Sequence, residues 1–230
     1  MIFEQLFDNK SSTYTYIIAS GKGREALIID PVIENTDEYI KILENLDLKL
    51  VKVIDTHIHA DHITGLNELS KRTNCTKIMG ENSKSEVIDL KVKDDEIIKI
   101  ENINLKTMYT PGHTDCSYSY LLDNRVFTGD TLLINGTGRT DFQNGSAHDA
   151  YQSLFDKLLK LPDETIVFPA HDYNQKKYST IGQEKANNPR LQVNSKEEYA
   201  EIMNNLKLAN PKMMDVAVPA NIKGLTLKEL

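Results

Sequence analysis

The stretch THIHADH, residues 56–62, places His57, His59, Asp61 and His62 directly after the apolar run LVKVID. Side chains two residues apart on an extended chain point the same way, so His57 and His59 share a direction, while Asp61 and His62 follow where the chain turns. A rigid strand that ends in such a loop presents polar side chains to a cleft. The stretch therefore predicts a functional site at the edge of a sheet.

Three further segments also place a polar side chain behind a short apolar run. His113 lies in TPGHTD after LKTMY, Asp130 ends NRVFTGD, and His171 lies in PAHDY after TIVF. Any one of these histidines, taken alone, is more often a hydrogen-bonded imidazole of the core or surface. Together they predict one shared volume, in which imidazoles and carboxylates without a cation would be left unpaired and desolvated. A divalent metal removes that cost, and nitrogen and oxygen donors suit zinc, iron or manganese.

Length and composition favour a single domain over residues 1–230, because 40% apolar residues in a chain of 230 can bury one sizeable core. The formal charge of -7 offers no basic field for nucleic acid or an anionic membrane. Cys75 and Cys116 form no CxxC pair, which argues against a thiolate zinc site or a disulfide framework. No apolar stretch approaches a spanning helix, and the start MIFEQLFDNK lacks a secretory layout, so we expect a cytoplasmic protein with a small-molecule substrate.

Hydrophobic periodicity predicts strands mixed with helices. Period-two patterns and short apolar runs bounded by turn residues indicate strands, and apolar stripes at helical spacing indicate helices over residues 36–46 and 146–161, the second capped by Ser146. This order favours an α+β fold with helix layers outside packed sheets. The expected strands cover residues 13–20, 25–30, 48–55, 75–80, 96–100, 105–110, 117–123 and 124–130, with a hairpin turn at Asp123-Asn124.

The stretch THIHADH fits the HxHxDH signature of the metallo-β-lactamase superfamily, and His113, Asp130 and His171 follow in the order that superfamily uses. The resemblance implies a four-layer αβ/βα sandwich with the metal site at one edge of the two sheets. It leaves the reaction open, because one fold hosts several activities.

A finer resemblance covers almost the whole chain. The segments THIHADHITG, TPGHT, FTGDTLLINGTGRTDFQNG, PAHDY, NNPRL and VPAN together resemble the persulfide dioxygenase (ethylmalonic encephalopathy protein-like) family, and GRTDFQ is the most discriminating of them. The resemblance implies one Fe(II) per chain, for which zinc could substitute, held by His57, His113 and Asp130. Two histidines and one carboxylate form the facial triad of non-haem iron enzymes.

The remaining donor residues have two possible roles. His59, Asp61, His62 and His171 would be hydrogen-bonding neighbours of a single iron, or ligands of a second metal. The implied reaction converts glutathione persulfide, or a similar low-molecular-weight thiol persulfide, with O₂ to sulfite. The resemblance is compatible with a homodimer, and the physiological thiol and any partner that supplies the persulfide remain open.

Two side chains outside the donor set are candidates for substrate binding. Arg139 could grip a glutathione carboxylate, since a guanidinium matches a carboxylate bidentately, or it could form a structural pair with Asp141. Tyr173 could donate a hydrogen bond to substrate or simply pack. Cys116 and Cys75 are expected to pack as small apolar residues rather than act as nucleophiles.

Two competing functions use the same residues. A glyoxalase II-like hydrolase would use two metals to activate water against a hydroxyacylglutathione thioester. Against it, only residues 172–230 follow His171, and their NNPRL and VPAN segments are unlike the helical glutathione-binding segment of that family. A non-enzymatic, metal-stabilised scaffold is the second alternative, which the complete donor set and GRTDFQ disfavour.

Overall fold

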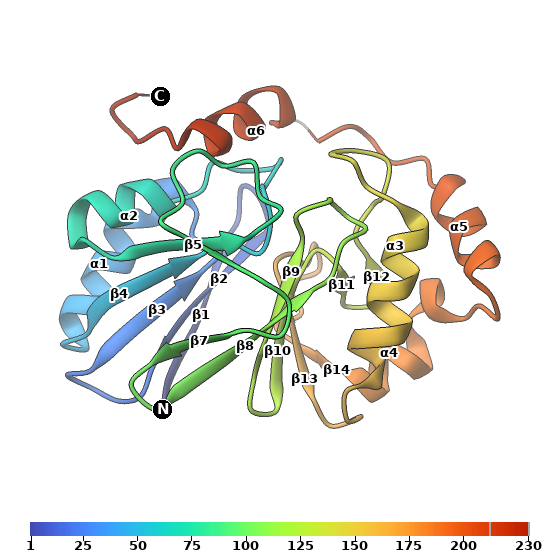
Figure 1. Cartoon of the computed structure of the whole chain (residues 1–230), viewed down its shortest axis with the longest axis horizontal. Coiled ribbons are helices and arrows are strands. Elements are labelled where there is room, and N and C mark those ends of the chain that lie inside the picture. Colours follow the sequence, from blue (N-terminus) through green and yellow to red (C-terminus); the bar gives the residue numbers. More distant parts are fainter. Residues whose placement is uncertain (212, 230) are drawn as a thin grey trace.

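The computed structural model describes residues 1–211 and 213–229, in which two mixed sheets face each other between outer layers of helices (Figure 1). The first sheet has the strand order β1 (Ile2–Asp8), β2 (Thr13–Ala19), β3 (Glu25–Ile29), β4 (Lys49–Ile54), β5 (Thr76–Gly80), β6 (Leu90–Val92). The second has the order β14 (Ser179–Thr180), β13 (Ile166–Pro169), β10 (Arg125–Gly129), β9 (Tyr118–Leu122), β8 (Ile103–Tyr109), β7 (Ile97–Ile100). A small hairpin pairs β11 (Leu132–Leu133) with β12 (Gly136–Thr137).

Alternation along the strands explains why the sheets pack face to face. In β2, Tyr14, Tyr16 and Ile18 enter a core between the sheets, while Ile17 and Ala19 point to the opposite face. The core between the sheets is rich in aromatic side chains, whose ring centroids lie 4.8–6.4 Å apart around Tyr16 and its neighbours. Both faces of β2 are therefore buried, which accounts for its almost continuous run of β-branched and aromatic residues.

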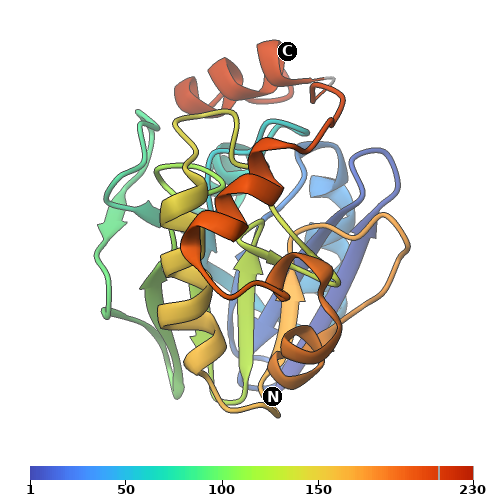
Figure 2. The ribbon, with the colours of Figure 1, turned by 90° about the vertical axis from the view of Figure 1, so that its right-hand side faces the viewer.

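Helices cover the outer faces of the two sheets. The helices α1 (Thr36–Asn45) and α2 (Leu66–Thr73) pack on the first sheet. The second sheet is covered by α3 (Ala147–Gln152), α4 (Ile181–Asn187) and α5 (Lys196–Asn204), as Figure 2 shows from the side. The last helix, α6 (Met214–Lys223), lies across the top of the molecule in both views. Short 3₁₀ helices span Ile33–Asn35, Leu158–Lys160 and Pro189–Leu191, and a π-helical turn spans Ser153–Lys157.

The expected α+β architecture is confirmed, as are the expected strands and both helices. Ser146 caps α3 as predicted, since its side chain accepts a hydrogen bond from the Asp149 N–H. The second helix is less regular than its apolar stripe indicates, because a π-helical turn and a 3₁₀ turn continue it to Lys160. The hairpin at Asp123-Asn124 is also present, with Asp123 in the left-handed region at φ 51°.

Several elements were not predicted: the strands β1, β6, β11, β12 and β14 and the helices α2, α4, α5 and α6. β1 is only partly buried along its length and lies at the sheet edge, so it lacks the apolar pattern of a central strand. α6 contains Pro219 within its span. Because proline disfavours the interior of a helix, local residue preferences do not predict a helix here.

Topology brings the polar strand ends to one edge. β8 and β10 both run antiparallel to β9, and β13 runs parallel to β10, so β8, β10 and β13 share one direction. His113, Asp130 and His171 follow the carboxyl ends of these three strands, and His57 follows β4 of the facing sheet. Within the part of the chain that the structure describes, no helix is long and apolar enough to cross a membrane.

We predict that Gly112→Ala destabilises the fold, because the loop before His113 passes directly against α3. Gly112 has φ 139°, and a Cβ there would lie 2.3 Å from the Cα and N atoms of Ala150. Backbone that must shift in this way costs about 3 kcal/mol, or a fall in Tm of about 6–12 °C for a domain of this size. Thermal unfolding measures the change.

Gly136→Ala provides the matched control for this substitution. A Cβ at Gly136 would meet nothing closer than the Leu133 Cβ at 3.9 Å, so its Tm should stay within about 2 °C of the wild type. Equal effects of the two substitutions would contradict the proposed clash.

Candidate metal centre

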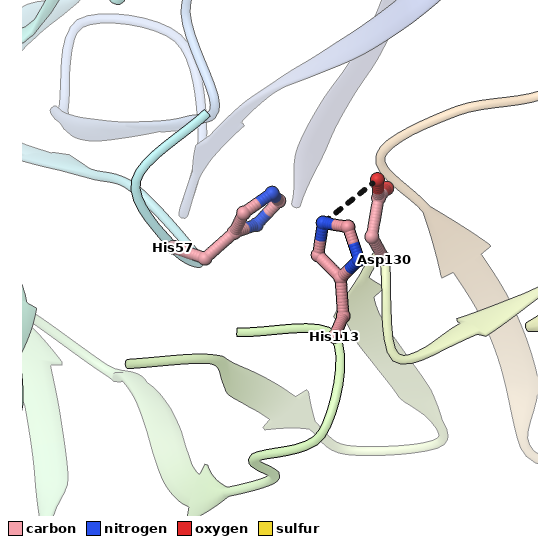
Figure 3. A group of neighbouring side chains, drawn as sticks. All are labelled: His57, His113 and Asp130. Atoms are coloured by element: carbon pink, nitrogen blue, oxygen red, sulfur yellow. Dashed lines mark ion pairs between the residues drawn. The ribbon is translucent and has the colours of Figure 1, made fainter. Parts of the chain in front are cut away.

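Three side chains that follow three strand ends face one another, as Figure 3 shows. One donor atom each from His57, His113 and Asp130 lies within 4.8 Å of the others. His113 Nε2 is 3.5 Å from Asp130 Oδ2, and the His57 and His113 rings are nearly perpendicular with centroids 4.9 Å apart. The structure therefore brings together the three residues predicted as the metal triad.

A second group of donors adjoins the triad. Donor atoms of His59, Asp61 and His62 also lie within 4.8 Å of one another. His171 links the two groups, since its Nε2 lies 3.3 Å from Asp61 Oδ2 and 3.7 Å from Asp130 Oδ1. The four residues predicted as neighbours or as a second metal site are thus in place.

Each of the five histidines uses one ring nitrogen to bind the protein. The Nδ1 atoms of His113 and His171 donate to the backbone carbonyls of Arg139 (2.8 Å) and Ser12 (3.2 Å). A carbonyl oxygen can only accept, so Nδ1 is the nitrogen that carries the hydrogen in both rings. His62 Nδ1 donates in the same way to Asp61 Oδ2 at 2.9 Å. In all three rings the Nε2 atom is the nitrogen left to bind a metal.

Asp30, which was not among the predicted site residues, orients the other two histidines. Its Oδ1 accepts from the Thr56 N–H (2.7 Å) and from His59 Nε2 (3.2 Å), and its Oδ2 accepts from the Thr56 hydroxyl (3.0 Å). That hydroxyl is left to accept from His57 Nδ1 at 2.9 Å. Asp30 follows the apolar strand EALII. The same pattern of a carboxylate behind a strand identified Asp130, and it could have identified Asp30.

Burial sets the protonation of the site. Burial, together with the neighbouring rings of His59 and His113, holds the pKa of His57 well below its ordinary value, so this imidazole is neutral and able to bind a cation. Burial also raises the pKa of Asp61, but His171 and His62 overcome it and hold that pKa well below its usual value. His171 behaves oppositely: burial lowers its pKa, but Asp130 and Asp61 raise it to about 10.

Several buried polar atoms of the site have no hydrogen-bond partner. These atoms are His59 Nδ1, His62 Nε2, Asp130 Oδ1 and His171 Nε2. Unpaired buried polar groups cost about 1–3 kcal/mol each and are rare in native proteins. Nitrogen and oxygen atoms of this kind are the donors that divalent cations prefer, and Asp130 belongs to the triad. The residues present therefore fit a bound metal.

Arg139 and Tyr173, the two candidates for substrate binding, lie at the border of the site. The Arg139 guanidinium pairs bidentately with Asp141 at 2.7 Å, donates to the Ala209 carbonyl at 2.7 Å, and stacks over Phe142. The pairing with Asp141 is the structural role that the sequence also allowed. Tyr173 is 77% exposed, and its ring is parallel to that of His171 with centroids 6.4 Å apart.

Both cysteines are buried within the core layer against the first sheet. Burial raises the pKa of the Cys116 thiol, whose Sγ lies 3.3 Å from the Thr114 hydroxyl. A buried thiol with a raised pKa is a poor nucleophile. The expected packing role of Cys116 and Cys75 is confirmed.

Comparisons with known proteins agree with this geometry. The family model of the metallo-beta-lactamase superfamily matches residues 9–97 and 83–171. The mitochondrial persulfide dioxygenase ETHE1 of Mus musculus is 40% identical over 97% of this chain and 88% of its own length. The crystal structure of ETHE1 from Myxococcus xanthus has a TM-score of 0.94 and 48% identity, and the match covers 96% of this chain and 98% of that one. A probable hydroxyacylglutathione hydrolase of Schizosaccharomyces pombe is 30% identical over 88% of this chain and 90% of its own length.

We predict that Asp130→Ala removes most of the bound metal, because it leaves only neutral imidazoles to hold a dication in a buried site. His171→Ala should retain at least half of the wild-type metal if His171 is a neighbour rather than a ligand. Elemental analysis of each variant, loaded with metal in the absence of oxygen, measures the metal content per chain. Equal loss in the two variants would instead indicate a shared two-metal site.

Proposed function

The chain belongs to the metallo-β-lactamase superfamily and, within it, to the persulfide dioxygenases, and from this membership we propose that it oxidises glutathione persulfide with O₂. The observation that carries the proposal is the grouping of two histidines and one carboxylate, His57, His113 and Asp130, within 4.8 Å. We propose that these residues hold one Fe(II). When bound there, such an iron offers open coordination positions at which a persulfide sulfur and O₂ can meet.

The proposed reaction balances without a further reductant. Glutathione persulfide, O₂ and water give glutathione, sulfite and two protons. The sulfur–sulfur bond breaks, the outer sulfur rises from the formal state 0 to +4, and O₂ takes up the four electrons. Two of the three sulfite oxygens correspond to O₂ and one to water.

In this proposal the protein orients the ligands before substrate arrives. The Arg139 carbonyl and the Thr56 hydroxyl hold Nδ1 of His113 and His57, so that each Nε2 faces the centre without reorganisation. His57 is 1% exposed, which keeps bulk water from that side. The substrate then enters from the side of Asp130 and Tyr173, where the site is more open.

The position of His171 supports a role beside the metal. In the metal-free protein its side chain faces both Asp61 and Asp130. We propose that His171 attracts the Asp130 carboxylate and is itself held by Asp61, rather than binding a second ion. Arg139 and Tyr173 would contact the glutathione part of the substrate, which requires a substrate carboxylate to share the guanidinium with Asp141.

The second candidate is hydrolysis of a hydroxyacylglutathione thioester at two metals. The complete donor set of His59, Asp61, His62 and His171 favours it, as does the 30% identity to a probable hydroxyacylglutathione hydrolase. The higher identity to persulfide dioxygenases, 40% and 48%, favours the oxidation. Both reactions use glutathione, so the metal and the oxygen requirement separate them.

We expect protein purified without oxygen to contain about one iron per chain and to consume O₂ with glutathione persulfide. Elemental analysis and an oxygen electrode measure the two quantities on the same sample. The triad leaves positions open for both reactants, which is the physical reason for the expectation. Two tightly bound zinc ions, thioester hydrolysis and no oxygen uptake would establish the hydrolase instead.

Arg139→Ala should lower kcat/KM for glutathione persulfide about tenfold to hundredfold while iron content stays unchanged. A charge-assisted hydrogen bond contributes about 1.5–3 kcal/mol, at about 1.4 kcal/mol per tenfold. A persulfide without carboxylates should show little difference between variant and wild type. Asp141→Ala is the matched control, since it removes the structural pair and leaves the guanidinium. Equal impairment toward both substrates, with lost thermal stability, would mean that Arg139 acts only as a structural partner.

A further inference from the structure

The loop that carries the histidine donors, residues 57–64, has backbone groups that the sheets do not satisfy. We call it the metal-donor loop. β4 ends at Ile54, and the carbonyls of Ile58, His59 and His62 all accept hydrogen bonds from side-chain amides of distant segments. Buried backbone groups require such partners, so these amides determine the conformation of the loop.

Asn221 of α6 supplies most of these bonds. Its Nδ2 donates to the carbonyls of His59 (2.9 Å) and His62 (3.0 Å), and its Oδ1 accepts from the Thr64 N–H (2.9 Å). The side chain is only 5% exposed. Both of its amide hydrogens and its oxygen are thus engaged with the metal-donor loop. α6 is held in place by an apolar cluster in which Ala217 and Ala220 pack against Ile63 and Ile33.

Gln143 supplies the remaining bond, from a different segment of the chain. Its Nε2 donates to the Ile58 carbonyl at 2.8 Å, and its own backbone is in the left-handed region at φ 48°. Gln143 ends the segment GRTDFQ, in which the Arg139 carbonyl accepts from His113 Nδ1. One short segment therefore contacts the metal-donor loop and also orients His113.

We propose that Asn221 and Gln143 are positioning residues for the metal centre. Their amides bind the backbone of the metal-donor loop at four points, so that the loop next to the ligand His57 is fixed before a metal binds. This gives the segments VPAN and GRTDFQ a shared role. The inference rests on the proposed function only in requiring a metal at His57, His113 and Asp130, and it does not depend on the reaction.

Removing either amide leaves buried carbonyls unpaired and lets the loop relax. Loss of three bonds should affect the metal more than loss of one. Residues that hold metal ligands from behind typically change metal affinity 10–100-fold when mutated. We expect a 10–100-fold faster metal release for Asn221→Ala and a several-fold faster release for Gln143→Ala.

Asn67→Ala is the matched control. Asn67 of α2 donates its side-chain amide to the Gly224 carbonyl at the end of α6, and therefore anchors the same helix without touching the metal-donor loop. Asn221→Asp tests the donor group and the acceptor group of the Asn221 amide separately. It retains an acceptor for Thr64, but it places a carboxylate oxygen against two carbonyl oxygens and should release metal at least as fast as Asn221→Ala.

The experiment loads each full-length variant with cobalt(II), records its visible spectrum, and follows loss of that spectrum in excess chelator. The proposal requires a changed spectrum and faster release for Asn221→Ala and Gln143→Ala, and values within twofold of wild type for Asn67→Ala. Circular dichroism of the metal-free proteins shows whether each folds, and Gln143→Ala carries the test alone if Asn221→Ala does not fold.

Wild-type spectrum and release rate in folded Asn221→Ala or Gln143→Ala would overturn the proposal. Equally fast release from Asn67→Ala would also overturn it, since general loosening of α6 would then suffice. Neither readout uses persulfide or O₂. Failure of the dioxygenase proposal would therefore appear in the oxygen measurements and leave these results unchanged.

Discussion

The structure depends on burying metal-binding atoms that the protein itself does not satisfy. His59 Nδ1, His62 Nε2, His171 Nε2 and Asp130 Oδ1 are buried without a hydrogen-bond partner. An unpaired buried polar atom costs about 1–3 kcal/mol, and the attraction of His171 to Asp61 and Asp130 offsets part of this cost in the metal-free chain. A cation held by Asp130 satisfies that carboxylate oxygen and converts its cost into binding energy, so folding and metal binding are coupled in this chain.

The rest of the fold holds these atoms in place from outside. Three strands of one sheet and one strand of the other end at the same edge, which sets the positions of the donor loops. Asp30, the Arg139 carbonyl and the Ser12 carbonyl then set which nitrogen of each ring faces inward. Asn221 reaches the same edge from the last helix, so segments from both ends of the chain contribute to the centre.

Local signals in the sequence predicted the parts of the molecule that are determined locally. Apolar runs indicated the central strands, and the polar residues behind them indicated the donors, because a strand end and its loop are neighbours in sequence. β1, an edge strand that is only partly buried, carries a weaker pattern. Asp30 follows an apolar strand as Asp130 does, so it could have been predicted in the same way. Gln143 and Asn221 gave no comparable signal, since their roles depend on contacts 85 and 162 residues away that only the folded chain creates. Similarly, the sequence left Arg139 open between substrate and Asp141, and only the structure reveals the bidentate pair.

Anomalous diffraction from crystals grown without oxygen tests the central claim most directly, by locating each metal and identifying it at the iron and zinc absorption edges. The account predicts a single iron peak per chain, bounded by His57, His113 and Asp130, with no second peak beside Asp61, His62 and His171. Two peaks of comparable height, or one peak displaced to the side of Asp61 and His62, would contradict a mononuclear triad.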